Sequence, residues 1–190
     1  MKLIFATNNA HKLSEIKQAV SNFQISGLKE SNIIEDIPET GDTLQENARL
    51  KAKFIFDKYG ENCFADDTGL EVEELNGEPG VYSARYAGED CSFGDNNEKL
   101  LRNLKGESNR SARFRTVICL IMDGEETYFE GVCEGKILES YHGDQGFGYD
   151  PIFQPMGFKE SFAQMTTAQK NKISHRGLAV QKLIKFLNQE

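Results

Sequence analysis

The sequence predicts an α/β fold, in which helices flank a mixed central sheet, within a single domain that spans residues 1–190. Three observations support it. The chain opens as a strand, a polar loop and an amphipathic helix; a second amphipathic helix leads into another short strand; and two long apolar strands meet at a tight turn in the middle. The length and a hydrophobic content of 38% suffice for one compact core.

The first strand is expected in the apolar run from Lys2 to Thr7. Apolar residues then recur at helical spacing and predict a helix over about residues 11–22. A second helix is expected over about residues 43–59, because Thr43 and Glu46 resemble a capping box. Gly60 would end this helix.

A short strand is expected over residues 63–66, with a turn at residues 67–69. Residues 70–94 read as loops and short strands, and residues 97–104 as a short helix. The remaining elements are a central strand over residues 112–122, a hairpin turn at Asp123-Gly124, a partner strand over residues 127–133, a glycine-rich loop over residues 143–148, and a final helix that begins at Ser174.

Composition excludes several classes of function. The net charge of −8 gives no basic stripe, so we expect no nucleic-acid partner, and phosphate binding would need local cations, amides or a metal. No apolar run approaches the ~20 residues of a membrane span, and the N-terminus is too short for a signal peptide. We therefore expect a cytoplasmic protein whose four scattered cysteines are reduced thiols rather than zinc ligands.

The first candidate site segment lies between the first strand and the first helix: Thr7, Asn8, Asn9, Ala10, His11 and Lys12. A helix N-terminus presents free amides and positive partial charge, which suits an anion, and Lys12 adds a full charge. An ordinary N-capping loop explains the segment equally well. It lacks the glycines of a P-loop.

The second candidate is Asp66-Asp67-Thr68-Gly69, at the end of the expected strand. Adjacent carboxylates in an exposed turn favour a shared cation, and Mg²⁺ prefers a few carboxylates together with water and substrate phosphates. One carboxylate could also accept a proton from an attacking water. The alternative is an Asx-type turn. Glu39 is a further acidic residue in a turn.

Two later segments complete the set. In Gly146-Phe147-Gly148-Tyr149-Asp150-Pro151, glycines permit close approach of the backbone and the aromatic rings could stack on a base. A tight turn with core aromatics is the alternative. Lys170, His175 and Arg176 belong to a basic stretch that precedes and opens the last helix, where cations oppose the helix dipole and an anionic or acceptor-rich ligand would relieve them. A solvated basic turn is the alternative.

These segments, together with Pro79-Gly80-Val81-Tyr82-Ser83-Ala84-Arg85, occur in the order seen in the inosine/xanthosine triphosphate pyrophosphatases, and the sequence resembles that family over nearly its whole length. The resemblance implies an elongated mixed sheet with two lobes around an active-site cleft, and a homodimer. It also implies Mg²⁺-dependent hydrolysis of ITP, dITP and XTP to the monophosphate and pyrophosphate, which would cleanse the nucleotide pool.

By position, the resemblance implies that residues 7–12 and Lys51 hold the triphosphate, that Glu39 and Asp67 bind Mg²⁺, and that Asp67 accepts the proton of water with support from Asp66. Thr68 would touch substrate. The base and sugar would be held by Phe147, Gly148, Tyr149 and Asp150, and the base pocket completed by Lys170, His175 and Arg176.

One departure stands out, because Asn8 replaces the glycine usual in the family's first loop. If that position needs a positive φ, asparagine is the best substitute. Two other functions remain open: a related pyrophosphatase for modified pyrimidine nucleotides, and a nucleotide-binding regulator without turnover. The Ser174-His175-Arg176 segment favours purines over pyrimidines, and the clustered carboxylates favour an enzyme.

Overall fold

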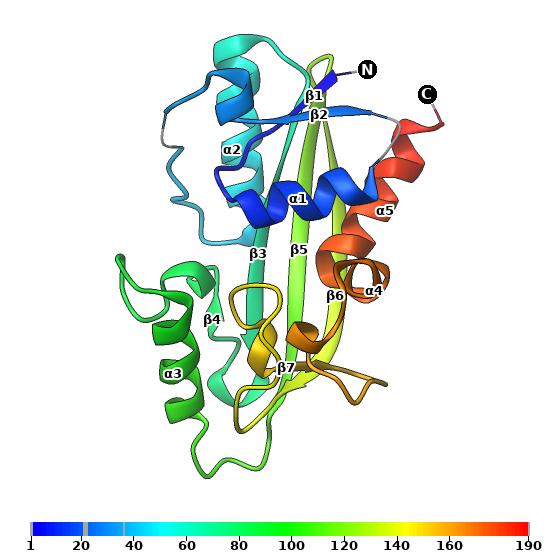
Figure 1. The fold of residues 1–190 in the computed structure, drawn as a ribbon. Coiled ribbons are helices and arrows are strands. Elements are labelled where there is room, and N and C mark those ends of the chain that lie inside the picture. Colours follow the sequence, from blue (N-terminus) through cyan, green and yellow to red (C-terminus); the bar gives the residue numbers. More distant parts are fainter. Residues whose placement is uncertain (1, 21–22, 36, 190) are drawn as a thin grey trace. The chain divides into compact units, whose positions relative to one another are not determined.

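The structure is a computed structural model that describes residues 2–20, 23–35 and 37–189. It is a mixed α/β fold (Figure 1), as the sequence predicts. The chain divides into two compact units: the first takes the described residues of Met1–Asp67, Thr116–Gly131 and Arg176–Glu190, and the second takes Thr68–Arg115 and Val132–His175. The single domain over residues 1–190 stays a prediction, as does the cleft between two lobes.

The strands form one sheet in the order β2-β1-β3-β5-β6-β7, with β4 paired to β3. β1 is parallel to both β2 and β3, whereas the β3–β4 and β6–β7 pairs are antiparallel. Sequence patterns did not predict β2 or β7. The strands are β1 (Lys2–Phe5), β2 (Gln24–Gly27), β3 (Cys63–Val72), β4 (Pro79–Gly80), β5 (Ser111–Met122), β6 (Glu125–Ile137) and β7 (Phe153–Pro155).

In the first unit, helices cover both faces of the sheet (Figure 1). Successive strand residues point to opposite faces, so each strand feeds two cores. Leu3, Phe5 and Phe64 pack with α1 (Ala10–Ala19) and α5 (His175–Leu187). Ile4 and the neighbours of Phe64 pack instead with α2 (Leu44–Tyr59). This alternation decides which way each functional side chain of β3 can point.

The second unit has its own core. Leu70 and Val72 of β3 and Phe114 of β5 pack there against Leu100 of α3 (Phe93–Asn103). Phe114 also makes an edge contact with Phe153, at 4.7 Å between ring centroids. The loops and short helices after β6, including α4 (Thr167–Ile173), therefore pack against a core rich in aromatic side chains.

The predicted helices are present with altered ends. α1 has Asn9 as its N-cap and ends at Ala19, while Ser21 and Asn22 of the predicted helix lie outside the described residues. α2 has the predicted capping box at Thr43 and ends at Gly60, whose φ of 65° suits glycine. α3 begins four residues before the predicted start, since Ser92 rather than a later residue caps it.

Two expectations at the later segments need correction. The basic stretch before Ser174 is helical, because Thr166 and Gln169 form a capping box that starts α4. The predicted turn at residues 67–69 does not exist, because β3 runs without a break to Val72. Leu70 and Val72 are fully buried, and Leu70 pairs with Gly80 of β4, so burial and pairing carry the strand through the acidic residues.

The hairpin turn is as predicted: Asp123 and Gly124 adopt φ values of 51° and 91° between β5 and β6. β5 lies between β3 and β6, which explains why both of its faces are apolar. Across the described part of the chain, none of the helices has the length and hydrophobicity to span a bilayer.

Candidate active site

The loop from Thr7 to Lys12 follows β1 beside the acidic residues of β3. β1 is parallel to β3 and ends with Phe5 opposite Phe64, so the loop that follows β1 lies beside Asp66 and Asp67 in the middle of β3. Asn9 caps α1 by accepting hydrogen bonds from the amides of His11 and Lys12, at 2.9 and 3.2 Å. Thr7 Oγ1 in turn accepts from the Asn9 amide at 3.1 Å.

Asn8 is exposed in this loop. Within the described residues, the non-glycine positions with positive φ are Asn32, Asn76 and Asp123, so Asn8 does not adopt a left-handed conformation. Its position does not require glycine, and the departure from the family pattern causes no backbone strain.

Asp66 points to the face of β3 that packs on α1 and α5, and it is 1% exposed. Lys12 Nζ donates to its Oδ1 at 2.9 Å, and Arg176 Nε donates to its Oδ2 at 3.1 Å. Arg176 also donates to Glu15 of α1. Burial alone would raise the pKa of Asp66, but the charges of Lys12 and Arg176 outweigh it and hold that pKa below its usual range.

Asp67 points to the opposite face, toward α2, and is 7% exposed. Lys51 Nζ lies 3.4 Å from its Oδ1 and also donates to Glu39. Burial raises the pKa of Asp67 despite the positive charges of Lys51 and Lys12. We expected the two adjacent aspartates to share a cation in an exposed turn. They pair with different cations instead, because consecutive residues of a strand point to opposite faces.

These side chains form two ion-pair networks in the first unit, one on each face of β3, and we call them together the carboxylate cluster. It has four carboxylates and three cations: Glu15, Asp66, Lys12 and Arg176 on one face, and Glu39, Asp67 and Lys51 on the other. Lys51 is 7% exposed and Arg176 is 3% exposed, so these charges interact at reduced dielectric. The excess of one carboxylate suits a further cation.

The residues fit a divalent metal in part. Nowhere in the described residues do three or more His, Cys, Asp or Glu side chains gather to hold an ion. Asp67 Oδ2, however, is buried without a hydrogen-bond partner among those residues. Glu39 pairs with Lys51, the same lysine that pairs with Asp67. Two carboxylates with substrate phosphates and water are the ligands that Mg²⁺ prefers.

The second unit holds the later predicted residues around one segment, residues 146–150, which we call the base loop. Asp150 is 3% exposed and accepts from Lys170 Nζ at 2.7 Å and from the Phe147 amide at 2.8 Å. Lys170 Nζ also lies 4.9 Å from the centre of the Phe147 ring. Gly146 has a φ of 78°, and a Cβ there would lie 2.1 Å from Asp150 Oδ2.

Phe147 is half-buried, whereas Tyr149 is 5% exposed and donates from its hydroxyl to the Ser83 carbonyl at 2.9 Å. The ring of Tyr149 therefore anchors the base loop to the core, and Phe147 is its more accessible aromatic residue. Thr68 is half-buried on β3.

The three basic residues expected at the base have different partners within their own units. Lys170 joins the base loop, and His175 stacks on Phe114 at 4.5 Å with an interplanar angle of 17°. Arg176 pairs with Asp66 and Glu15 of the carboxylate cluster. Its role at the base remains a prediction.

Four residues near these sites escaped the sequence analysis. Glu15 follows Lys12 by three positions on α1, and Asn47 precedes Lys51 by four on α2, which are spacings that share a helix face. Asn47 is buried and accepts from the Gly41 amide at 2.8 Å, close to Glu39. Phe93 and Asn97 of α3 contact the base loop. Helical spacing could have found the first two, but nothing local marks the others.

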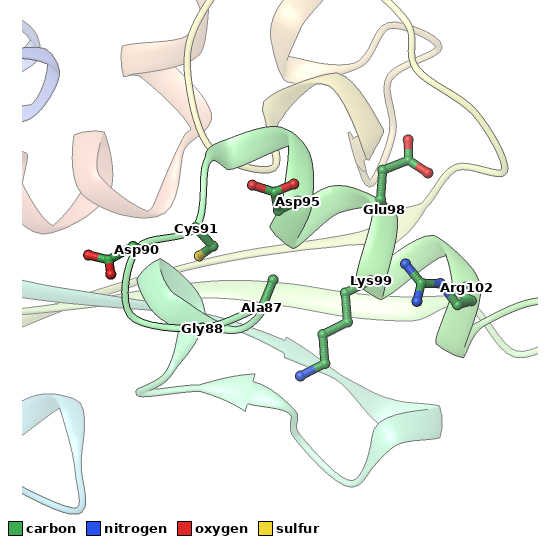
Figure 2. Close-up of a pocket in the computed structure, with 8 residues that line it drawn as sticks. All are labelled: Ala87, Gly88, Asp90, Cys91, Asp95, Glu98, Lys99 and Arg102. Carbon is green, nitrogen blue, oxygen red and sulfur yellow. The ribbon is translucent and has the colours of Figure 1, made fainter.

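A pocket of about 520 Å³ also lies in the second unit, around the turn at Ala87-Gly88 and the start of α3 (Figure 2). None of the predicted site residues lines it. Two of its charged groups serve the fold: Asp95 caps α3, and Lys99 donates to the Tyr86 carbonyl and lies 4.2 Å from that ring's centre.

Comparison with known proteins places these features in context. The pattern of the Ham1 family matches residues 3–186. The chain is 53% identical to the dITP/XTP pyrophosphatase of Christiangramia forsetii over 99% of this chain and 100% of that one. It is 55% identical to the dITP/XTP pyrophosphatase of Porphyromonas gingivalis, over 98% and 97% of the two chains.

Solved structures agree. The Ham1 protein of Staphylococcus aureus superposes with a TM-score of 0.90 at 41% identity, covering 99% of this chain and 98% of that one. The HAM1 protein of Coxiella burnetii gives a TM-score of 0.92 at 36% identity, with both chains fully covered. The likeness over the full length of both structures confirms the mixed α/β fold that the sequence predicts.

Proposed function

The chain belongs to the Ham1 family, and on that premise we propose that it hydrolyses dITP, ITP and XTP to the nucleoside monophosphate and pyrophosphate. The observation that carries the proposal is the environment of Asp67. One carboxylate oxygen of Asp67 is buried without a partner among the described residues. Lys51, a cation that suits phosphate, lies beside the other oxygen.

In the proposed reaction, Lys12 and Lys51 neutralise the triphosphate, while the amides at the start of α1 donate to its oxygens. Asp67 accepts a proton from the water that attacks the α-phosphorus, and pyrophosphate leaves. Asp66 holds Lys12 in place through its ion pair. This assigns different tasks to two neighbouring carboxylates, consistent with the opposite directions of their pKa shifts.

We further propose that Glu39 and Asp67 hold a Mg²⁺ ion. When bound, such an ion neutralises phosphate charge and lowers the pKa of a coordinated water. Lys51 now bridges these two carboxylates, so it would move toward substrate phosphate as the ion binds. The Glu39 side chain is 33% exposed, so its carboxylate has room to adjust its position when the ion binds.

Base recognition is proposed to use the base loop, with Phe147 stacking on the purine and Lys170 donating. Hypoxanthine and xanthine carry an acceptor oxygen at C6, where adenine carries an amino donor. The Lys170 ammonium has three N–H donors, one of which Asp150 accepts, so Lys170 can also donate to that C6 oxygen. Adenine would set an amino donor against this buried ammonium, and mismatches of that kind discriminate strongly. We also propose that the protein is a homodimer in the cytoplasm. Light scattering of the purified protein tests for the dimer.

The test is release of pyrophosphate from dITP, XTP, dATP, dGTP and a methylated pyrimidine triphosphate, with and without Mg²⁺. Release confined to dITP and XTP, together with dIMP and XMP as products, is expected. Preferential release from the pyrimidine would establish the related pyrophosphatase instead. Nucleotide binding without release would establish a regulator.

A further inference from the structure

Helix α3 contacts the base loop at two adjacent residues. Asn97 Nδ2 donates to the Gly148 carbonyl at 3.0 Å. The ring of Phe93 lies 6.1 Å from that of Phe147, with an interplanar angle of 45°. Phe93 and Asn97 are four positions apart, so they share one face of the helix. All four residues belong to the second unit.

The amide of Asn97 is not explained by stability. The residue is 2% exposed, and its Oδ1 has no hydrogen-bond partner in the described part of the chain. A buried acceptor without a partner is costly, and an apolar side chain of similar size would avoid that cost. Asn97 also hydrogen-bonds the side chain of Tyr141, so the amide serves to hold groups outside its own helix, among them the Gly148 carbonyl.

Gly148 is the residue of the base loop that most needs an external anchor. Both neighbours of Gly148 are held in place: the Phe147 amide donates to Asp150, and the Tyr149 hydroxyl donates to the Ser83 carbonyl. Gly148 has no side chain, and its φ of 61° lies in a region where glycine has alternatives of similar energy. Its peptide orientation depends on what holds its carbonyl, and Asn97 does so.

We propose that Asn97 is a positioning residue for purine recognition, and that Phe93 assists it by supporting the ring of Phe147. Asn97 fixes the Gly148 peptide, and this fixes the plane that Phe147 presents to a base. Neither residue touches the phosphates or the reacting atoms. This inference rests on the proposed function, because it assigns the selection of the base to α3.

The test is Asn97→Leu, which keeps the number and branching of the side-chain heavy atoms but removes both the donor and the buried acceptor. We expect kcat/KM for dITP to fall by about 10-fold to 100-fold, because small displacements of substrate-positioning groups have effects of that size. Most of the loss should appear in KM. The preference for dITP over dGTP and dATP should also narrow, whereas the Tm should hold or rise.

Calorimetric titration separates this role from general damage. IMP should bind Asn97→Leu at least about 10-fold more weakly, while pyrophosphate binds as it does to the wild type. The matched control is Asn103→Leu on the same helix, where the side chain donates to the Tyr86 hydroxyl at 2.8 Å and is away from the base loop. This control should keep wild-type KM and selectivity.

Two further variants guard against misfolding. Asn97→Asp keeps the shape but sets a carboxylate against the Gly148 carbonyl, so it should lose selectivity as Asn97→Leu does. Phe93→Ala changes a residue that is 46% exposed, so its fold is safe, and it should raise KM by a smaller factor. Wild-type KM and selectivity in folded Asn97→Leu or Asn97→Asp would overturn the inference.

The two levels of the account fail separately. A wild-type protein that releases no pyrophosphate from dITP or XTP would refute the proposed function. A wild-type protein that does so, with Asn97→Leu matching Asn103→Leu in KM, selectivity and IMP affinity, would refute the role of α3 alone.

Discussion

The carboxylate cluster and the base loop achieve order by opposite means. In the cluster, side chains from five separate segments pair charge against charge, and the strand alternation of β3 directs Asp66 and Asp67 to different partners. In the base loop, five consecutive residues are held by hydrogen bonds that each join a backbone group to a side chain, together with the ion pair from Lys170 to Asp150. The cluster is thus built to handle charge, and the base loop to hold a shape.

This difference predicts that substitutions in the two regions affect different steps. Changes to Lys12, Lys51 and Asp67, the cluster residues proposed to act on substrate, should alter turnover and phosphate binding, whereas changes at the base loop should alter the choice of base. Asp67→Asn, Asp150→Asn and Lys12→Ala test that separation directly.

The largest effect is expected from Asp67→Asn, which removes the proposed proton acceptor. The value of kcat for dITP should fall by about 10²-fold to 10⁴-fold, the range that general base catalysis supplies. Affinity for IMP should be unchanged, as measured by calorimetry. A folded Asp67→Asn protein with near-normal kcat would remove the catalytic role of Asp67.

The next effect is expected from Asp150→Asn in the base loop. Lys170 would lose its buried counter-charge, and a hydrogen bond to a charged group contributes about 1.5–3 kcal/mol. Steady-state kinetics should show the preference for dITP over dATP reduced by about 10-fold. Pyrophosphate affinity should hold, and its loss in this variant would break the proposed separation.

A smaller effect, on stability rather than activity, is expected from Glu15→Gln. Arg176 is buried and keeps Asp66 as a partner but loses one charge, so the free energy of unfolding should fall by about 1–3 kcal/mol. Urea titration measures this. The control is Glu30→Gln, whose exposed partner Lys17 should leave stability unchanged. Equal losses in both variants would show that burial of the Arg176–Glu15 pair contributes nothing to the free energy of unfolding.

The smallest effect on activity is expected from alkylation of the native thiols. Burial raises the pKa of Cys63 and Cys133 to about 12 and that of Cys119 to about 11. A thiol reacts as thiolate, so at pH 8 these three should resist iodoacetamide and react faster only as the pH rises toward those values. Cys91 is partly exposed in the pocket of Figure 2 and belongs to neither region.

Peptide mass spectrometry should therefore find Cys91 labelled first, with activity retained. Loss of activity in step with Cys91 labelling would show that the pocket takes part in function. In increasing urea, simultaneous labelling of Cys63 and Cys133 would indicate that the two units unfold as one domain, and separate labelling that they do not.

Much of the fold follows from patterns that sequence displays directly. The capping box at Thr43, the glycine at position 60 and the turn at Asp123-Gly124 each specify their element by local chemistry, and the structure contains all three. The turn predicted at residues 67–69 was wrong because local polarity is a weak guide inside a sheet. Pairing with neighbouring strands, which sequence does not show, overrides it.

The site divides in the same way. Lys12, Asp66 and Asp67 carry charges that the sequence displays, and their association follows from the parallel pairing of β1 with β3. The tie from Asn97 to Gly148 joins residues 51 positions apart through a neutral side chain. No charge, spacing or turn signal marks such a contact, so only the folded chain reveals it.

The separation between the two regions is tested most directly by measuring the binding of pyrophosphate and of IMP to Lys12→Ala and Asp150→Asn. Lys12→Ala should weaken pyrophosphate binding by about 10-fold or more and leave IMP binding nearly unchanged, because it removes a charged donor from the cluster. Asp150→Asn should do the reverse. If both variants weakened both ligands equally, the cluster and the base loop would not act on separate parts of the nucleotide, and the account would be contradicted.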